Sequence, residues 1–121
     1  MANYRHFDAE KVGDVLVVRL VDRRLADTMS VNELQDEMLM LLEQMPTKKL
    51  LVSFQKVTHC STSVINGLLR AKKKLLAVGG QIKLCELQPL IREAYKLLNL
   101  DGTVFHIHDS EAEALAGFSY V

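Results

Sequence analysis

The sequence predicts a single α/β domain, a mostly parallel mixed sheet with about four helices. Short apolar runs rich in Val, Leu and Ile alternate along the chain with longer segments whose apolar residues recur every three or four positions. Such alternation of strands and helices is typical of a parallel sheet covered by helices. The chain has 121 residues, a length that fits one hydrophobic core. We therefore assign residues 1–121 to one domain.

The composition is that of an ordinary globular protein. Hydrophobic residues make up 49% of the chain, and 15 acidic residues balance 15 Lys and Arg, so nothing in the charge favours nucleic acid as a partner. No apolar run is long enough to span a bilayer, and the polar N-terminus is unlike a secretory signal. The two cysteines, Cys60 and Cys85, do not form a CxxC motif. We expect a cytoplasmic protein without direct membrane insertion.

The first part of the chain predicts a hairpin and a helix. Residues 4–12 and 15–21 flank the turn signal Gly13-Asp14 and should pair as antiparallel strands at one edge of the sheet. A polar connection, residues 22–28, follows, and Thr28 or Ser30 is expected to cap a helix that ends before Pro46. The apolar positions of that helix are Val31, Leu34, Met38, Leu41, Leu42 and Met45.

The remaining elements alternate regularly. Residues 50–54 are almost wholly apolar and predict a central strand with both faces covered. A helix with Val64, Leu68, Ala71 and Leu75 on one stripe runs to Gly79-Gly80. Further segments are residues 81–85 as a strand, a helix from Gln88-Pro89 to residues 99–102, residues 104–108 as a strand, and a last helix opened by the capping box Ser110–Glu113.

Three consecutive hydroxyl residues, Ser61, Thr62 and Ser63, stand where the central strand gives way to the next helix. A hydroxyl at this point can accept a hydrogen bond from an unpaired backbone N–H, and Ser61 is the expected cap. Thr62 would then be exposed at the positive end of the helix dipole, where an added phosphate is electrostatically tolerated. The alternative is that the three hydroxyls only start the helix.

Two further groups of reactive side chains occur. His106 and His108 should share one face of a strand, but two ligands do not make a metal site, so we expect no metal. Cys60, next to His59, could be a reactive thiol or a structural cysteine, and its place at the end of a strand favours the structural role. The chain has neither a GxxxxGK[ST] loop nor a GxSxG elbow. We expect no cofactor and no enzymatic activity.

The order of elements and the residues around the hydroxyl cluster resemble the STAS domain, the fold of anti-sigma-factor antagonists. The family has an aspartate, two hydroxyl residues, a glycine and a leucine at the start of the helix after the central strand, and this frame falls on residues 61–65. Val57, Leu68 and Gly79-Gly80 stand at the family's spacing. The segments 81–85, 89–92 and 98–101 resemble the family's next strand and helix.

The resemblance implies a protein-binding switch in transcription regulation. In such antagonists the first hydroxyl of the frame is phosphorylated by a serine kinase that is also an anti-sigma factor, and only the unphosphorylated form binds that kinase and frees the sigma factor. By position, the phosphorylated residue is Thr62, with Ser63 as the second choice. The residues expected to bind the partner are His59, Ser61, Thr62, Ser63, Val64 and Asn66.

The sequence departs from the family pattern at Ser61, at Thr62, which replaces a serine, and at Val64. Ser61 replaces the aspartate and can cap a helix, but it supplies no charge to orient a phosphoryl transfer. Val64 replaces the glycine and adds a branched side chain where a partner would approach. A second function therefore stays open: a constitutive STAS adaptor or scaffold, as in stressosome-like assemblies or a lipid-transport complex. In either case, residues 22–28 should lie beside the hydroxyl cluster, because loops gather at the carboxyl edge of a parallel sheet.

Overall fold

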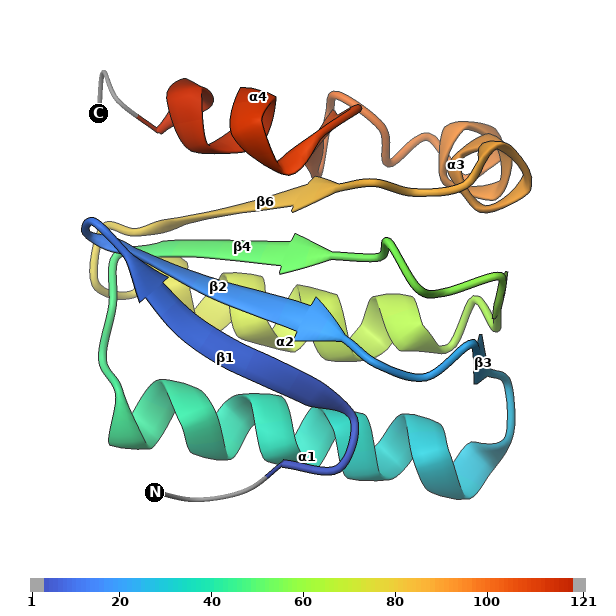
Figure 1. Ribbon diagram of the computed structural model, residues 1–121, viewed down its shortest axis with the longest axis horizontal. Helices are drawn as coiled ribbons and strands as arrows, with labels where there is room; N and C mark the ends of the chain where they lie inside the picture. Colours follow the sequence, from blue (N-terminus) through green and yellow to red (C-terminus); the bar gives the residue numbers. More distant parts are fainter. Residues whose placement is uncertain (1–3, 119–121) are drawn as a thin grey trace.

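The computed structural model describes residues 4–118 and has the predicted α/β architecture, with a five-stranded mixed sheet at its centre. The ends of the predicted domain, residues 1–3 and 119–121, lie outside the described residues. Strand order is β1-β2-β4-β6-β7 (Figure 1), and only the β1–β2 hairpin is antiparallel. The strands are β1 (Phe7–Val12), β2 (Val15–Leu20), β4 (Lys49–Ser53), β6 (Gln81–Cys85) and β7 (His106–His108).

Within residues 4–118, four helices pack around this sheet. Helices α1 and α2 cover one face, α4 lies on the other, and α3 sits beyond the carboxyl ends of the strands (Figure 1). Their bounds are α1 (Thr28–Gln44), α2 (Val64–Leu76), α3 (Pro89–Leu97) and α4 (Glu111–Gly117). The predicted hairpin edge, the parallel core and the number of helices are therefore confirmed.

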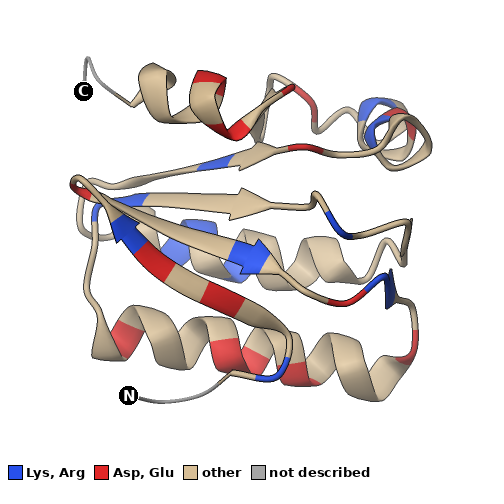
Figure 2. Ribbon diagram, in the orientation of Figure 1, with Lys and Arg blue, Asp and Glu red and all other residues tan. Residues whose placement is uncertain are grey.

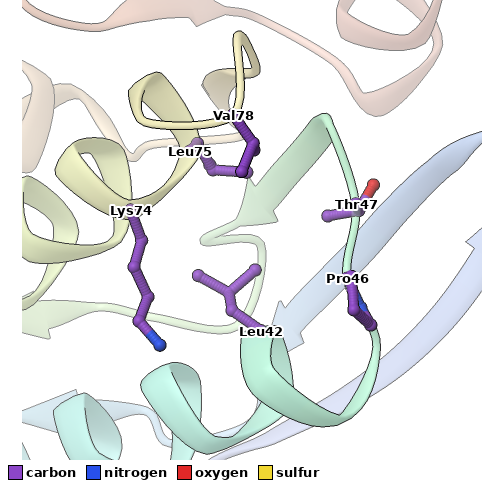
Figure 3. Close-up of a pocket in the computed structure, with 6 residues that line it drawn as sticks. All are labelled: Leu42, Pro46, Thr47, Lys74, Leu75 and Val78. Carbon is purple, nitrogen blue, oxygen red and sulfur yellow. The ribbon is translucent and has the colours of Figure 1, made fainter.

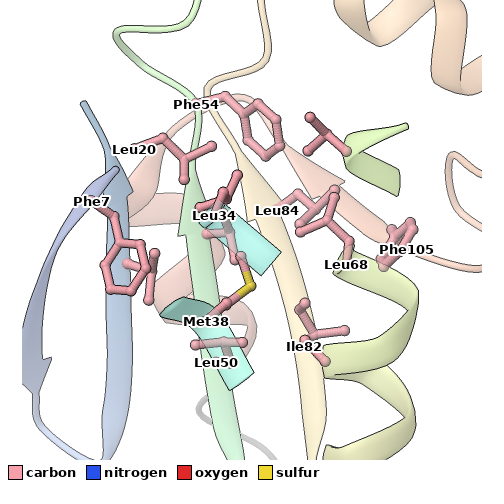
Figure 4. Packing of buried hydrophobic residues seen from close by; sticks show 14 of the residues in the cluster. Phe7, Leu20, Leu34, Met38, Leu50, Phe54, Leu68, Ile82, Leu84 and Phe105 are labelled. Atoms are coloured by element: carbon pink, nitrogen blue, oxygen red, sulfur yellow. The ribbon is translucent and has the colours of Figure 1, made fainter. Parts of the chain in front are cut away.

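Strand β4 is buried on both faces, as its apolar sequence predicted. Leu50 and Val52 point into the larger core with α1 and α2, whereas Leu51 packs in the smaller cluster under α4. This alternation follows from the period of two residues in a strand. Figure 4 shows the larger core, in which side chains from α1 and α2 meet those of β2, β4 and β6.

The start of α1 corrects one prediction. Its N-cap is Asp27, whose carboxylate accepts a hydrogen bond from the backbone N–H of Ser30 at 2.8 Å, and the helix already includes Thr28. The predicted caps Thr28 and Ser30 are wrong, because Asp27 is the residue with extended backbone and stands three positions before a free N–H. At α4, Ser110 caps the helix by accepting from the N–H of Glu113, as predicted.

Two short strands were not predicted. β3 (Arg24–Leu25) and β5 (His59–Cys60) pair in parallel as a separate two-stranded sheet. Strands of two residues are too short to give a periodic pattern. The last strand of the main sheet is also shorter than expected, since β7 begins at His106 and not at residue 104.

Gly80, which follows the end of α2, packs closely against the backbone of Lys48. A Cβ atom at this position would lie 2.8 Å from the carbonyl oxygen of Lys48, whereas one at Gly79 would meet nothing within 4 Å. We predict that Gly80→Ala lowers the free energy of unfolding by about 2 kcal/mol through this clash. Gly79→Ala should cost about 1 kcal/mol, because its φ of +73° is strained for alanine. Urea denaturation of both variants measures the difference, and a smaller loss for Gly80→Ala would contradict the close approach.

Candidate functional site

The candidate site lies at the carboxyl edge of the sheet, where the loop between β4 and α2 runs beside the loop between β2 and α1. Backbone hydrogen bonds join the two loops. The carbonyl oxygen of Arg23 accepts from the N–H groups of Thr58 and His59, at 2.8 and 3.1 Å. The N–H of Ser61 donates to the carbonyl oxygen of Leu25 at 2.8 Å. The predicted proximity of residues 22–28 to the hydroxyl cluster is confirmed, and the β3–β5 pair holds the cluster in place.

The three hydroxyl residues form a tight turn before α2, and Ser61 does not cap this helix, contrary to the prediction. The helix begins at Val64, two residues later than expected, and its N-cap, Ser63, makes no side-chain capping bond. The Oγ atom of Ser61 instead accepts from the N–H of Ser63 at 3.2 Å and lies 2.8 Å from the Ser63 Oγ atom. Ser61 is therefore not the helix cap, and its hydroxyl stabilises the turn itself.

Thr62 is the hydroxyl that this turn presents to solvent. Its side chain is exposed, and within residues 4–118 its hydroxyl makes no hydrogen bond to another group. Ser63 is also exposed, but its hydroxyl is held by that of Ser61. The carbonyl oxygen of Thr62 accepts from the N–H of Ile65 at 3.0 Å, so the backbone of the turn is ordered. Of the two predicted phosphate acceptors, Thr62 has the freer hydroxyl.

The predicted contact residues divide into a surface group and one core residue. His59, Thr62, Ser63 and Asn66 are exposed, and Ser61 is partly exposed. Val64 is only 2% exposed and packs in the larger core. It occupies the first position of the apolar stripe of α2, and burial of that stripe turns its side chain away from the surface. The prediction that Val64 contacts a partner is therefore wrong.

The thiol of Cys60 is partly buried behind this surface. Burial raises its pKa to about 11, and the sulfur lies 3.6 Å from the carbonyl oxygen of Ser61. Burial also raises the pKa of the Tyr95 hydroxyl, with a smaller contribution from Cys60. The thiol is thus protonated at neutral pH, which agrees with the structural role favoured by the sequence and not with an activated nucleophile.

A polar hollow with two cationic side chains lies between the β2–α1 and β4–α2 loops. It measures about 520 Å³ and is lined by Val21, Arg23, Gln55, Lys56, Thr58 and Gln88. Both cations, Arg23 and Lys56, have exposed side chains. Sequence reasoning did not single them out, although Arg23 stands in the connection that was expected to lie here.

The two histidines lie on β7, which forms an edge of the main sheet. His106 is exposed and His108 is partly buried. Burial lowers the pKa of His108, and the neighbouring Lys83 lowers it further; the Lys83 amine is 3.4 Å from Nε2 of the ring. Within residues 4–118, no three or more His, Cys, Asp or Glu side chains are grouped so as to hold a metal ion.

The comparison with protein families decides the identity of the fold. The family model for the STAS domain matches residues 6–114. This chain belongs to the STAS domain family. The match covers all five strands of the main sheet, and it includes the whole turn from Ser61 to Ser63.

Solved structures support the same fold for this STAS domain. A STAS-domain anti-sigma-factor antagonist from Planctomyces limnophilus superposes with a TM-score of 0.81 at 21% identity, over 92% of this chain and 95% of its own. An anti-sigma factor antagonist from Mycobacterium paratuberculosis gives 0.80 at 17% identity, over 92% and 91%. The phosphorylated form of the Bacillus cell fate determinant SpoIIAA gives 0.67 at 22% identity, over 92% and 97%. Identities this low establish the fold alone.

Two further findings concern the whole set of described residues and the search for relatives. A search of curated protein sequences gives no match. Across the part of the chain that the structure describes, none of the helices combines the length and the apolar character needed to cross a membrane.

The environment of Cys60 predicts low thiol reactivity. At about pH 8, Cys60 in the folded STAS domain should react with iodoacetamide roughly 100-fold more slowly than in the unfolded chain, because a raised pKa leaves little thiolate. Peptide mass spectrometry after timed alkylation resolves Cys60 from Cys85. Equal rates in the folded and unfolded chain would contradict the structural role.

Proposed function

We propose that this STAS domain is a cytoplasmic protein-binding module that acts as an anti-sigma-factor antagonist and is switched by phosphorylation of Thr62. Its partner is a serine kinase that is also the anti-sigma factor. The observation that carries the proposal is the free, exposed hydroxyl of Thr62 on an ordered turn at the start of α2. The domain binds and does not catalyse.

The physics of the switch follows from the position of Thr62. A phosphate adds roughly −1.5 to −2 charges at neutral pH. A partner shaped to make close contact with a neutral hydroxyl would be repelled by that charge. Because the Thr62 side chain makes no hydrogen bond within residues 4–118, the modification breaks no contact that holds the fold. The phosphate therefore changes one interface and leaves the core intact.

The similar structures support the general role. Both the phosphorylated and the unphosphorylated form of SpoIIAA, an anti-sigma factor antagonist, share this fold. A regulatory domain of this shape can thus carry a phosphate without unfolding. The kinase and the site of modification in this chain remain our proposal.

One observation favours a second function, a constitutive adaptor or scaffold. Ser61 stands where the family frame has an aspartate, and its hydroxyl is occupied by the N–H and hydroxyl of Ser63. No carboxylate is thus present at this position to orient a phosphoryl transfer. An adaptor would use the same exposed surface, His59, Thr62, Ser63 and Asn66, without modification.

Phosphorylation of Thr62 distinguishes the antagonist from the constitutive adaptor. The wild-type protein, Thr62→Ala and Ser63→Ala are incubated with ATP and a lysate of the native host, and their intact and peptide masses are compared. We predict one phosphate on wild type and on Ser63→Ala, and none on Thr62→Ala. Absence of phosphate from all three, while a control STAS protein is modified, would reject the switch and leave the adaptor.

Charge at position 62 should control binding of the kinase. We predict that Thr62→Asp weakens capture of the partner about tenfold, equivalent to about 1.4 kcal/mol, with an unchanged melting temperature. Thr62→Asn is the matched control, since it has nearly the same shape without the charge. Affinity of the purified partner for each variant gives the result, and equal losses for Asp and Asn would show that shape and not charge matters.

A further inference from the structure

A second candidate surface lies at the opposite edge of the sheet, where α1 and α2 end and β4 begins. Two adjoining hollows, of about 240 and 550 Å³, share Pro46, Thr47 and Val78 as lining residues and form one groove. The first is lined also by Leu42, Lys74 and Leu75, and the second by Lys11, Asp14, Lys48 and Lys49. We call this the amino-edge groove.

The floor of the amino-edge groove is apolar. Leu42 comes from the last turn of α1 and Leu75 from the last turn of α2. In Figure 3, Leu75 and Val78 lie together opposite Leu42, with Pro46 and Thr47 to one side. Val78 is 54% exposed, although a valine gains free energy by burial. Met45 and Leu76, at the ends of the same two helices, are also exposed. This end of the domain can therefore accept an apolar side chain from outside.

The rim of the groove is positively charged. Lys49 pairs with Asp14 at 2.6 Å and Lys74 with Glu43 at 3.2 Å. Lys11 and Lys48 are exposed and form no ion pair within residues 4–118. Figure 2 shows blue segments at the end of β1, before β4 and along α2.

The two unpaired lysines have no evident role in the fold. Lysines in the last turn of α2 complement the helix dipole, which accounts for Lys73 and Lys74. Lys11 belongs to β1, and Lys48 precedes β4, so neither has that function. Their charge is available to a ligand with carboxylates.

We propose that the amino-edge groove docks an acidic amphipathic segment of a partner protein. An apolar side chain of the segment enters the hollow over Leu42, Leu75 and Val78, and its carboxylates lie against Lys11 and Lys48. Charge complementarity selects this occupant, because the groove combines an apolar floor with an excess of positive charge.

This docking is independent of the switch at Thr62. Helix α2 has 13 residues and separates the two edges by about 20 Å. An exposed phosphate at that distance is screened in physiological salt. The inference therefore goes beyond the proposed function and does not depend on phosphorylation.

Three short peptides with the same helical spacing test the chemistry of the occupant. The first combines Leu and Glu, the second replaces each Glu by Lys, and the third replaces each Leu by Ser. Each is titrated into the isotope-labelled full chain, and amide shifts are followed by NMR. We expect only the Leu–Glu peptide to bind, with shifts centred on Thr47, Lys48 and Val78. Binding of the Lys peptide, shifts elsewhere, or no binding at millimolar peptide would overturn the proposal.

Variants locate the contacts. Lys48→Glu should weaken binding of the Leu–Glu peptide about fivefold at low salt, and Val78→Ser by a similar factor through lost burial. Lys56→Glu, the same charge reversal at the opposite edge, is the control and should have no effect, as should Thr62→Asp. Equal weakening by Lys48→Glu and Lys56→Glu would overturn the proposal.

Other possible occupants of the amino-edge groove would give different experimental results. Concentration-dependent dimerisation abolished by Val78→Ser, without peptide binding, would assign the groove to a second copy of the chain. Binding to vesicles containing phosphatidylserine, without peptide binding, would assign it to an anionic lipid surface. Either result rejects the acidic partner segment. Thr62→Asp should bind the peptide like wild type. Loss of peptide binding would therefore reject the docking proposal alone, and absence of phosphorylation would reject the switch alone.

Discussion

Complete burial of β4 is the constraint on which the rest of the structure depends. Leu50, Leu51 and Val52 have no exposed surface, because α1 and α2 cover one face of the strand and α4 covers the other. A sheet covered in this way presents no side chain from its centre to a partner. Contacts with a partner are therefore expected at the two edges of the sheet, where the strands begin and end.

The carboxyl edge is suited to a switch because its order comes from the backbone. The turn is held by the β3–β5 pair and by the hydrogen bond from the N–H of Ser61 to the carbonyl oxygen of Leu25. Neither uses the Thr62 side chain. Position 62 can therefore change its charge while the turn keeps its shape. At the amino edge, the helix ends and the rim lysines form a groove whose ligand need not sense that change.

The sequence predicted the long elements of the fold because each carries many repeats of its period. The stripe of α2 is an example, whereas the short strand β4 was predicted by its continuous apolar run. Element starts were harder to predict, since Asp27, Thr28 and Ser30 can all cap a helix and only the backbone conformation decides among them. The β3–β5 pair escaped prediction because it is defined by contact between distant segments and not by a local pattern.

The candidate site was found by its hydroxyl residues, but the geometry of their side chains was not. Ser61 bonds to Ser63 and not to the first turn of α2, because the helix starts later than the sequence suggested. Val64 was expected at both the core and the surface, and burial of the helix stripe decided in favour of the core. The amino-edge groove was not predicted at all, since its lining comes from three separate segments of the chain.

The proposed switch requires that phosphate on Thr62 alters a surface and not the fold. Its most direct test is an amide NMR map of the protein carrying genetically encoded phosphothreonine at position 62, compared with the unmodified protein. We predict shift changes confined to residues 58–66 and the adjoining residues 23–26. Changes that extend through β4 into α1 would mean that the phosphate reorganises the core, and would contradict the proposed switch.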